Sequence, residues 1–384
     1  MASQTPKDAS LWTHFTSLKD RRIERCRKHS LQDILVISIC GFICGVDNWV
    51  DMELFGHAKL AWFRTFLELP NGIPSHDTFG RVFSLLEPEA FARCFTQWVQ
   101  SVADVTQGQV VAIDGKAVRR SFEKASQKSC VHLVNAWAAE QRMVLGQVAC
   151  AEKSNEITAI PQLLELLALK GCIVTLDAMG CQRALVEQIV QKGADYVICL
   201  KGNQEALHEA AKTVFAGVGV EEGHAPGSPG PCVETFEEGH GRVETRRCWV
   251  SSQVQAYARH EEWQGLRSFA MVESERTVRE KNETQVERRY FISSLPADDA
   301  ARMLSIIRTH WAVENDLHWS LDVAFREDDS RVRQDQAQQN MAMMRRLALS
   351  LLKQDTQTKA GIAARRKKAG WDHDYLLALL TRHS

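Results

Sequence analysis

The sequence predicts an α/β protein in which an all-helical segment precedes a mixed β-sheet with helices on its faces. Up to about residue 105, apolar residues recur every three or four positions, as they do in amphipathic helices. From about residue 109 they recur at every second position, as they do in strands. Three strand patterns come first, and two more then alternate with helices. This order indicates a five-stranded sheet that combines parallel and antiparallel strands.

The composition is that of a globular protein long enough for two or three domains. The 384 residues are 45% hydrophobic and 25% charged, with a formal net charge of -1. Any surface for nucleic acid must therefore be local, and basic residues do cluster at 19–28 and 365–368. The eleven cysteines lack metal-ligand spacing, so we expect reduced thiols. The longest apolar run, Ile34–Val46, is shorter than the roughly 20 residues that cross a bilayer, which predicts a cytoplasmic protein without membrane contact.

The N-terminal segment contains well-marked helix starts. Ser30 and Ser75 are placed to cap two helices, and residues 55–69 have the pattern of another helix between them. A turn rich in Pro and Gly precedes Ser75. With His76 and Arg81 exposed, these helices fit either a DNA-binding helix-turn-helix or an ordinary helical bundle.

After residue 105 the chain alternates between strands and helices and carries one insertion. The expected strands cover 109–114, 131–137, 143–150, 173–177 and 196–201, and the expected helices cover 157–169, 182–192, a segment that Asp298 caps, and 335–353. A β-rich insertion spans about 205–297, with a loop at 214–231 and strands at 242–250, 268–272 and 285–293. We therefore divide the chain into an N-terminal helical domain (1–105), an α/β domain (106–355) and a basic C-terminal tail (356–384).

Three acidic residues stand out against this background. Asp114 and Asp177 each end a buried strand, and Glu314 lies on the apolar stripe of a late helix. Carboxylates that point into one buried place repel each other unless cations neutralise them, so the pattern predicts a divalent-metal site. Asp322, on the same helix face, is the strongest rival to Glu314.

Carboxylates on rigid elements suit Mg²⁺, which prefers oxygen ligands. Two such ions, roughly 4 Å apart, serve nucleases and strand-transfer enzymes, whereas two carboxylates alone would serve a glycosidase. Basic residues near the acids favour a polyanionic substrate over a neutral sugar; they are Lys116, Arg119, Arg120, Lys201 and Arg308.

Five motifs together resemble the ISAs-type insertion-sequence transposases, which include the H-repeat-associated proteins. They are Ala-Ile-Asp114-Gly-Lys116-x-x-Arg119, Glu152 to Pro161, Val174 to Gln182, Ala194 to Gln204, and His310-Trp-x-Val-Glu314-Asn-x-Leu-His318 with the following residues to Val323. The likeness runs from about Asp20 to about Leu351, and residues 69–81 resemble the family's N-terminal associated domain.

The resemblance implies an RNase H-like fold with a DDE site. Asp114, Asp177 and Glu314 would hold two Mg²⁺ ions, with Mn²⁺ able to replace them. The implied reaction is cleavage at the element's ends, followed by attack of the 3'-hydroxyl on target DNA without a covalent enzyme intermediate. The implied partners are DNA ends, target DNA and a second copy of the chain on paired ends.

The chain departs from the wider family around its third acid. A Tyr, an Arg and a Lys of the common signature are replaced by Ile307, His310 and Leu321. The residues that we therefore expect to contact DNA are Lys116, Arg119, Arg120, Lys201, Asn203, Arg308, His310 and His318. Trp249 or Trp263 of the insertion is a candidate to stack on an unpaired base, although core packing is the commoner role.

Two other functions fit the same residues. One is an inactive transposase relic that only binds DNA, and the other is a hydrolytic nuclease of the same fold that cuts without joining. A strand-transfer assay separates the nuclease from a transposase.

Overall fold

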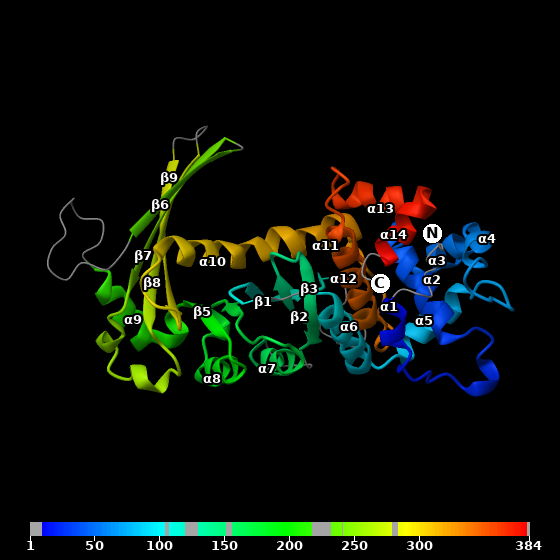
Figure 1. Cartoon of the computed structure of the whole chain (residues 1–384), viewed down its shortest axis with the longest axis horizontal. Coiled ribbons are helices and arrows are strands. Elements are labelled where there is room, and N and C mark those ends of the chain that lie inside the picture. The colour runs from blue at the N-terminus through cyan, green and yellow to red at the C-terminus, as the bar shows by residue number, and fades with distance from the viewer. Residues whose placement is uncertain are drawn as a thin grey trace. The chain divides into compact units, whose positions relative to one another are not determined.

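The computed structural model describes residues 10–103, 107–119, 130–150, 156–216, 232–239, 241–278 and 283–381. The chain divides into two compact units (Figure 1). Unit 1 comprises residues 1–105, 115–167 and 313–384, and unit 2 comprises residues 106–114 and 168–312. Strand β1 (Val110–Ala117) begins in unit 2 and ends in unit 1.

Unit 1 is mainly helical. Its helices are α1 (Ser10–Phe15), α2 (Leu31–Cys44), α3 (Trp49–Ala58), α4 (Leu60–Phe63), α5 (His76–Leu85), α6 (Pro88–Val102), α7 (Glu156–Leu166), α11 (Trp319–Phe325), α12 (Ala337–Gln354), α13 (Ile362–Trp371) and α14 (His373–Thr381). Strands β2 (His132–Ala138) and β3 (Met143–Ala149), both at predicted positions, form an antiparallel hairpin.

The predicted helix caps are confirmed, but one predicted helix has different limits. The Ser30 side chain accepts a hydrogen bond from the Asp33 backbone N–H, and that of Ser75 accepts one from Thr78. The segment predicted as one helix over 55–69 is divided between α3 and α4. Helix α3 begins earlier than predicted because Asn48 caps it.

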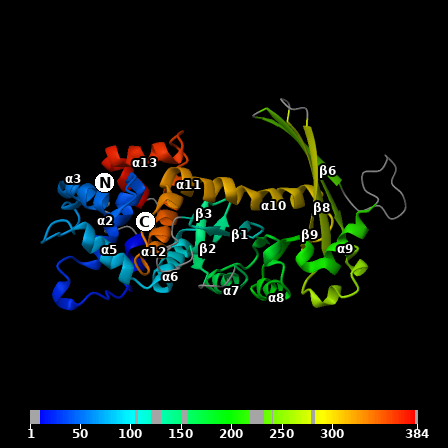
Figure 2. The same ribbon diagram turned by 180° about the vertical axis from the view of Figure 1, so that it is seen from behind.

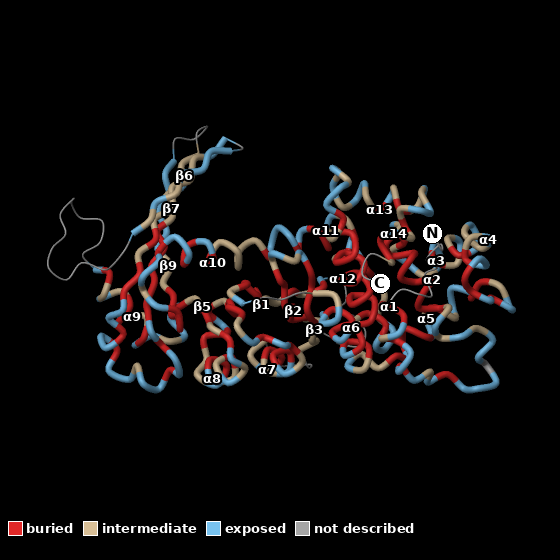
Figure 3. The backbone as a smooth tube through the Cα atoms, in the orientation of Figure 1, coloured by how far each residue is buried: buried red, intermediate tan, exposed pale blue. Residues whose placement is uncertain are grey.

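Helix α12 forms the centre of unit 1. Nearly all of its side chains are buried (Figure 3), including Arg345 and Arg346. It packs against α2, α5 and β3, and Figure 2 shows it among these helices from behind. A helix that is buried on all sides is a core helix.

The C-terminal segment is folded. Residues 356–384, predicted as a basic tail, contain helices α13 and α14. Arg365 donates hydrogen bonds to the carbonyls of Leu352 and Thr358, and the buried Arg366 donates to the carbonyl of Phe42. Two of the four cations in this cluster therefore stabilise the fold.

Asp355 ties this segment to α12, and its contribution should depend on pH. Its carboxylate accepts hydrogen bonds from the Thr358 backbone N–H and the Tyr375 hydroxyl. Burial alone would raise the pKa of Asp355, but these bonds outweigh burial and hold that pKa well below its usual range. A lowered folded-state pKa stabilises the fold above the unfolded-state pKa of about 4 and ceases to do so as the pH falls.

We therefore expect Asp355→Ala to lower the free energy of unfolding by about 2 kcal/mol at pH 7 and by clearly less near pH 2.5. Chemical denaturation at both pH values measures the difference. Tyr375→Phe, which removes one of the bonds, should have a smaller effect. An equal loss for Asp355→Ala at both pH values would contradict the assignment.

Unit 2 holds most of the sheet. Its further strands are β4 (Ile173–Leu176), β5 (Asp195–Leu200), β6 (Cys232–Gly239), β7 (Arg242–Ser251), β8 (Ser268–Val278) and β9 (Glu283–Ser293), and its helices are α8 (Arg183–Gln191), α9 (Glu205–Val214) and α10 (Ala300–Val313). Among the described residues the strand order is β3-β2-β1-β4-β5-β9-β8-β7-β6. Strands β1, β4 and β5 are parallel, and β5 pairs antiparallel with β9.

The mixed α/β fold class is confirmed, but the five-stranded sheet is too small. The sheet has nine strands because those of the insertion continue from β5 in the same sheet. Strand β6 and helix α9 were not predicted. The cap of α10 is Asp299, whose side chain accepts from the Arg302 backbone N–H, and not Asp298.

Two other expectations bear on the described residues. All ten cysteines with described side chains are free. No single described helix is long and apolar enough to cross a membrane. Helices α2 and α3 together have the length and apolar composition of a membrane span, but they are bent by 97°. Helix α2 itself is mostly buried.

Candidate active site

Asp114 and Asp177 occupy equivalent places on neighbouring parallel strands. In the register of β1 and β4, Ile113 is the partner of Leu176. Asp114 and Asp177 are the residues that follow this pair. Because parallel strands end at the same edge of a sheet, the two aspartates lie at one edge, as their positions in the sequence predicted.

The loop after β4 holds Asp177 in place. The Asp177 carboxylate accepts hydrogen bonds from the backbone N–H groups of Met179 and Gly180 at 3.0 and 3.2 Å. The side chain of Asn203, which lies just before α9, donates to the Ala178 carbonyl at 2.7 Å and so anchors the same loop. The acid is therefore oriented by backbone donors.

Glu314 is placed differently from the sequence prediction. It begins a π-helical turn, Glu314–His318, between α10 and α11. The side chain of Glu314 is 69% exposed, whereas the sequence predicted a buried position on the inward stripe. The π turn separates the helical stretch that holds Ile307 from the one that holds Leu321, so the residues before and after it do not form the single regular stripe that the sequence prediction assumed.

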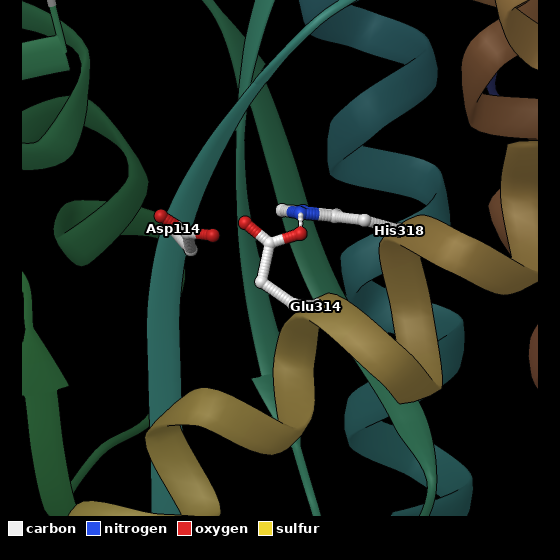
Figure 4. Close-up of side chains that lie close together, drawn as sticks. All are labelled: Asp114, Glu314 and His318. Atoms are coloured by element: carbon white, nitrogen blue, oxygen red, sulfur yellow. Dashed lines mark hydrogen bonds and ion pairs between the residues drawn. The ribbon is translucent and has the colours of Figure 1, made fainter. Parts of the chain in front are cut away.

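Asp114, Glu314 and His318 form a group that could hold a metal ion. Each offers one ligand atom, and these atoms lie within 4.8 Å of one another (Figure 4). Glu314 and His318 belong to the same turn, with 3.3 Å between a carboxylate oxygen and Nδ1. Asp114 lies on β1, directly before the residue at which the strand enters unit 1. Within the part of the chain that the structure describes, Asp177 is not a member of this group.

The acids that follow Glu314 are neutralised by cations. The pairs are Asp316 with Lys353 at 3.5 Å, Asp322 with Lys116 at 2.6 Å, Glu327 with Arg346 at 2.6 Å and Asp328 with Arg119 at 3.4 Å. Glu314 faces His318 instead, and burial lowers the pKa of His318. Among the described residues, Asp322 is held by the Lys116 ammonium, whereas Glu314 contacts the His318 ring, whose lowered pKa favours its neutral form. This difference favours Glu314 over Asp322 as the third ligand.

The comparisons with known proteins agree with this geometry. Residues 106–351 match the family described as Transposase DDE domain, and residues 12–99 match the family described as DDE_Tnp_1-associated. The chain belongs to the DDE transposases. It is 40% identical over 373 residues to "Putative transposase YncI" of Escherichia coli O157:H7, covering 97% of this chain and 94% of the relative.

A second relative confirms the predicted resemblance. The transposase is 36% identical over 375 residues to "H repeat-associated putative transposase YhhI" of Escherichia coli strain K12, covering 96% of this chain and 97% of the relative. The piggyBac transposase of a synaptic complex with hairpin DNA is a distant structural neighbour, with a TM-score of 0.44 and 11% identity over 94% of this chain and 75% of that one. Its membership of the DDE transposase family makes the chain an enzyme of DNA cleavage and strand transfer.

Several residues predicted to contact DNA have partners within the transposase. Lys116 is buried and bonded to Asp322, Asn203 holds the Ala178 carbonyl, and Arg308 pairs with Glu237. The His310 ring bonds the Thr175 hydroxyl at 2.9 Å. These contacts join residues far apart in the sequence, so they could not be predicted from local patterns.

The remaining predicted contacts fall into three groups. Arg119 and Lys201 are exposed, and His318 is buried. Arg120 lies outside the described residues. Trp263 is buried in the core, as expected of a packing residue.

Gly115 gives a test of the packing beside Asp114. A Cβ at this position would overlap the Glu156 carboxylate, which is bonded to His132 at 2.8 Å. We expect Gly115→Ala to displace Glu156 and lower the free energy of unfolding by roughly 1–3 kcal/mol. Thermal or chemical denaturation measures this loss. Gly202→Ala, where an added Cβ meets nothing within 4 Å, is the control and should change stability far less.

Proposed function

We propose that Asp114, Asp177 and Glu314 are the catalytic residues of the transposase and that they hold divalent metal ions, Mg²⁺ in the cell. The observation that carries the proposal is the grouping of Asp114, Glu314 and His318 within 4.8 Å. Asp177 is included because it follows β4 at the same register position at which Asp114 lies on β1. Oxygen-rich donors of net negative charge suit Mg²⁺ or Mn²⁺.

Bound divalent ions would supply activation of a hydroxyl nucleophile and stabilisation of the leaving oxygen of a phosphodiester. The chain's own groups would set the geometry. Backbone donors of Met179 and Gly180 orient Asp177, and His318 orients Glu314. The acids themselves form no bond to DNA in this reaction.

We further propose that DNA, as element ends and as target, reaches this site past exposed cations such as Arg119 and Lys201. The N-terminal domain, residues 1–105, is the proposed contributor to end binding. Two copies of the chain would bring two ends together, and the reaction would take place in the cytoplasm with Mn²⁺ able to replace Mg²⁺.

The test is strand cleavage and joining by the purified protein on labelled DNA from the borders of its own gene. Reactions contain Mg²⁺, Mn²⁺ or EDTA, and Asp177→Asn is assayed beside the wild type. We expect nicking and joined products with either metal, and neither product with EDTA or with the variant. Nicking by the Asp177→Asn variant at the wild-type rate would exclude Asp177 from the site.

The same assay decides between the other two functions. Metal-dependent nicking without joined products would indicate a hydrolytic nuclease. Tight binding to the borders without cutting in either metal would indicate an inactive relic.

A further inference from the structure

The end of β1 faces the turn that carries Glu314. Alternate side chains of a strand share one face, so Asp114 and Lys116 point the same way. Glu314 and His318 contact each other within the π turn, and Asp322 lies in α11, which follows that turn directly. The Lys116 ammonium donates to both carboxylate oxygens of Asp322, at 2.6 and 2.8 Å.

We propose that Lys116 is a positioning residue of the transposase, and that its ion pair with Asp322 fixes the place of the Glu314–Asp322 segment along β1. The proposal rests on the proposed function, because it assigns to this pair the alignment of Glu314 with Asp114. It replaces the expectation that Lys116 contacts a phosphate.

The burial of Lys116 supports this role. Its side chain is 8% exposed, whereas that of Asp322 is 35% exposed. A buried ammonium is stable only when it is paired, so the lysine is committed to the acids of this segment. Asp328 adds a second attachment, 3.7 Å from Lys116 and 3.4 Å from Arg119.

The pair lies where its loss would matter to Glu314. Asp322 is on α11, directly after the π turn, and Lys116 is two residues after Asp114 on β1. Glu314 itself is exposed and bonded within its own turn to His318. Its place relative to β1 therefore depends on attachments made by its neighbours.

A matched pair elsewhere in unit 1 separates positioning from stability. Arg366 and Asp47 are 3.1 Å apart and are 5% and 29% exposed, much like Lys116 and Asp322. Asp47→Asn removes the carboxylate of a buried cation, as Asp322→Asn removes the nearer of the two carboxylates around Lys116. The two variants should lose similar stability. Asp47→Asn leaves the Arg366 bond to the Ala324 carbonyl of α11 in place, so only Asp322→Asn removes a direct attachment of the segment that carries Glu314.

The experiment compares full-length wild type with Lys116→Met, Lys116→Arg, Asp322→Asn and Asp47→Asn. Mn²⁺ affinity is measured by calorimetry, and hydrogen exchange is followed in residues 314–322. We expect Lys116→Met and Asp322→Asn to weaken Mn²⁺ binding about tenfold and to speed exchange in this segment. Lys116→Arg and Asp47→Asn should bind Mn²⁺ like the wild type.

Each variant has an outcome that decides the question. If Asp322 were itself a metal ligand, Lys116→Met would free its carboxylate and tighten Mn²⁺ binding. Wild-type affinity and exchange in both Lys116→Met and Asp322→Asn would overturn the positioning role. If Lys116→Met fails to fold, Asp322→Asn and Lys116→Arg still decide. A wild type that neither binds Mn²⁺ nor cuts DNA would refute the proposed function instead.

Discussion

Glu314→Gln is expected to abolish DNA cleavage and joining while leaving the fold intact. The side chain is 69% exposed and contacts His318 in the same turn, so amide replacement should change the free energy of unfolding by less than about 1 kcal/mol. Loss of the charge removes one of the carboxylates proposed to hold metal. Removal of one group that stabilises transition-state charge typically lowers the rate by about 10²–10³-fold.

Asp316→Asn is the matched control for Glu314→Gln. Asp316 lies two residues away in the same π turn, is 51% exposed and pairs with Lys353. Joined products on border DNA are measured for both variants with Mg²⁺ and Mn²⁺. Wild-type activity in Glu314→Gln, or equal losses in the two variants, would remove Glu314 from the proposed site.

Arg346→Met is expected to give the largest loss of stability, about 3–5 kcal/mol. Arg346 and Glu327 are both fully buried, 2.6 Å apart, and Arg346 also donates to the Asn135 side chain on β2. Burial alone would raise the pKa of Glu327, but Arg346 and Arg345 outweigh burial and lower it. The variant leaves the buried carboxylate of Glu327 without the positive charge of Arg346 beside it.

The loss in Arg346→Met should depend on pH. Glu327 with a lowered folded-state pKa stabilises the wild type above the unfolded-state pKa of about 4.3 and less as the pH falls through it. The difference between wild type and variant should therefore shrink from pH 7 to pH 4, as measured by chemical denaturation. Arg259→Met, at the exposed pair with Glu262, is the control and should change stability far less, because water and salt screen an exposed ion pair. An equally small loss in Arg346→Met would contradict the role given to the buried pair.

The positions of Asp114 and Asp177 could be predicted because both depend on local pattern. Each follows a run of apolar, β-branched residues. Such a run predicts a buried strand without any knowledge of distant parts of the chain. The parallel pairing of β1 with β4 then brings the two strand ends together.

The partners of Lys116 and Arg365 could not be predicted in this way. Lys116 pairs with Asp322, more than two hundred positions away, and Arg365 donates to backbone carbonyls, which leave no mark in the order of residues. A run of cations therefore suggests a surface for polyanions even where the fold has already used the charges.

Glu314 and strand β6 show two further limits of pattern. A regular helix was assumed for Glu314, and the π turn departs from that period. The mostly exposed β6 lacks the buried alternate residues that identify a strand, and it directly follows a segment rich in Gly and Pro.

The π turn also makes the position of Glu314 sensitive to the in-frame loss of a single codon. Such a turn accommodates one residue more than a regular helix would, so loss of one codon within 314–318 would let α10 run into α11 as an ordinary helix. The acid would then turn away from β1 although the buried residues of α10 and α11 remained. We expect a copy of the gene with this lesion to encode a folded protein that no longer cuts DNA.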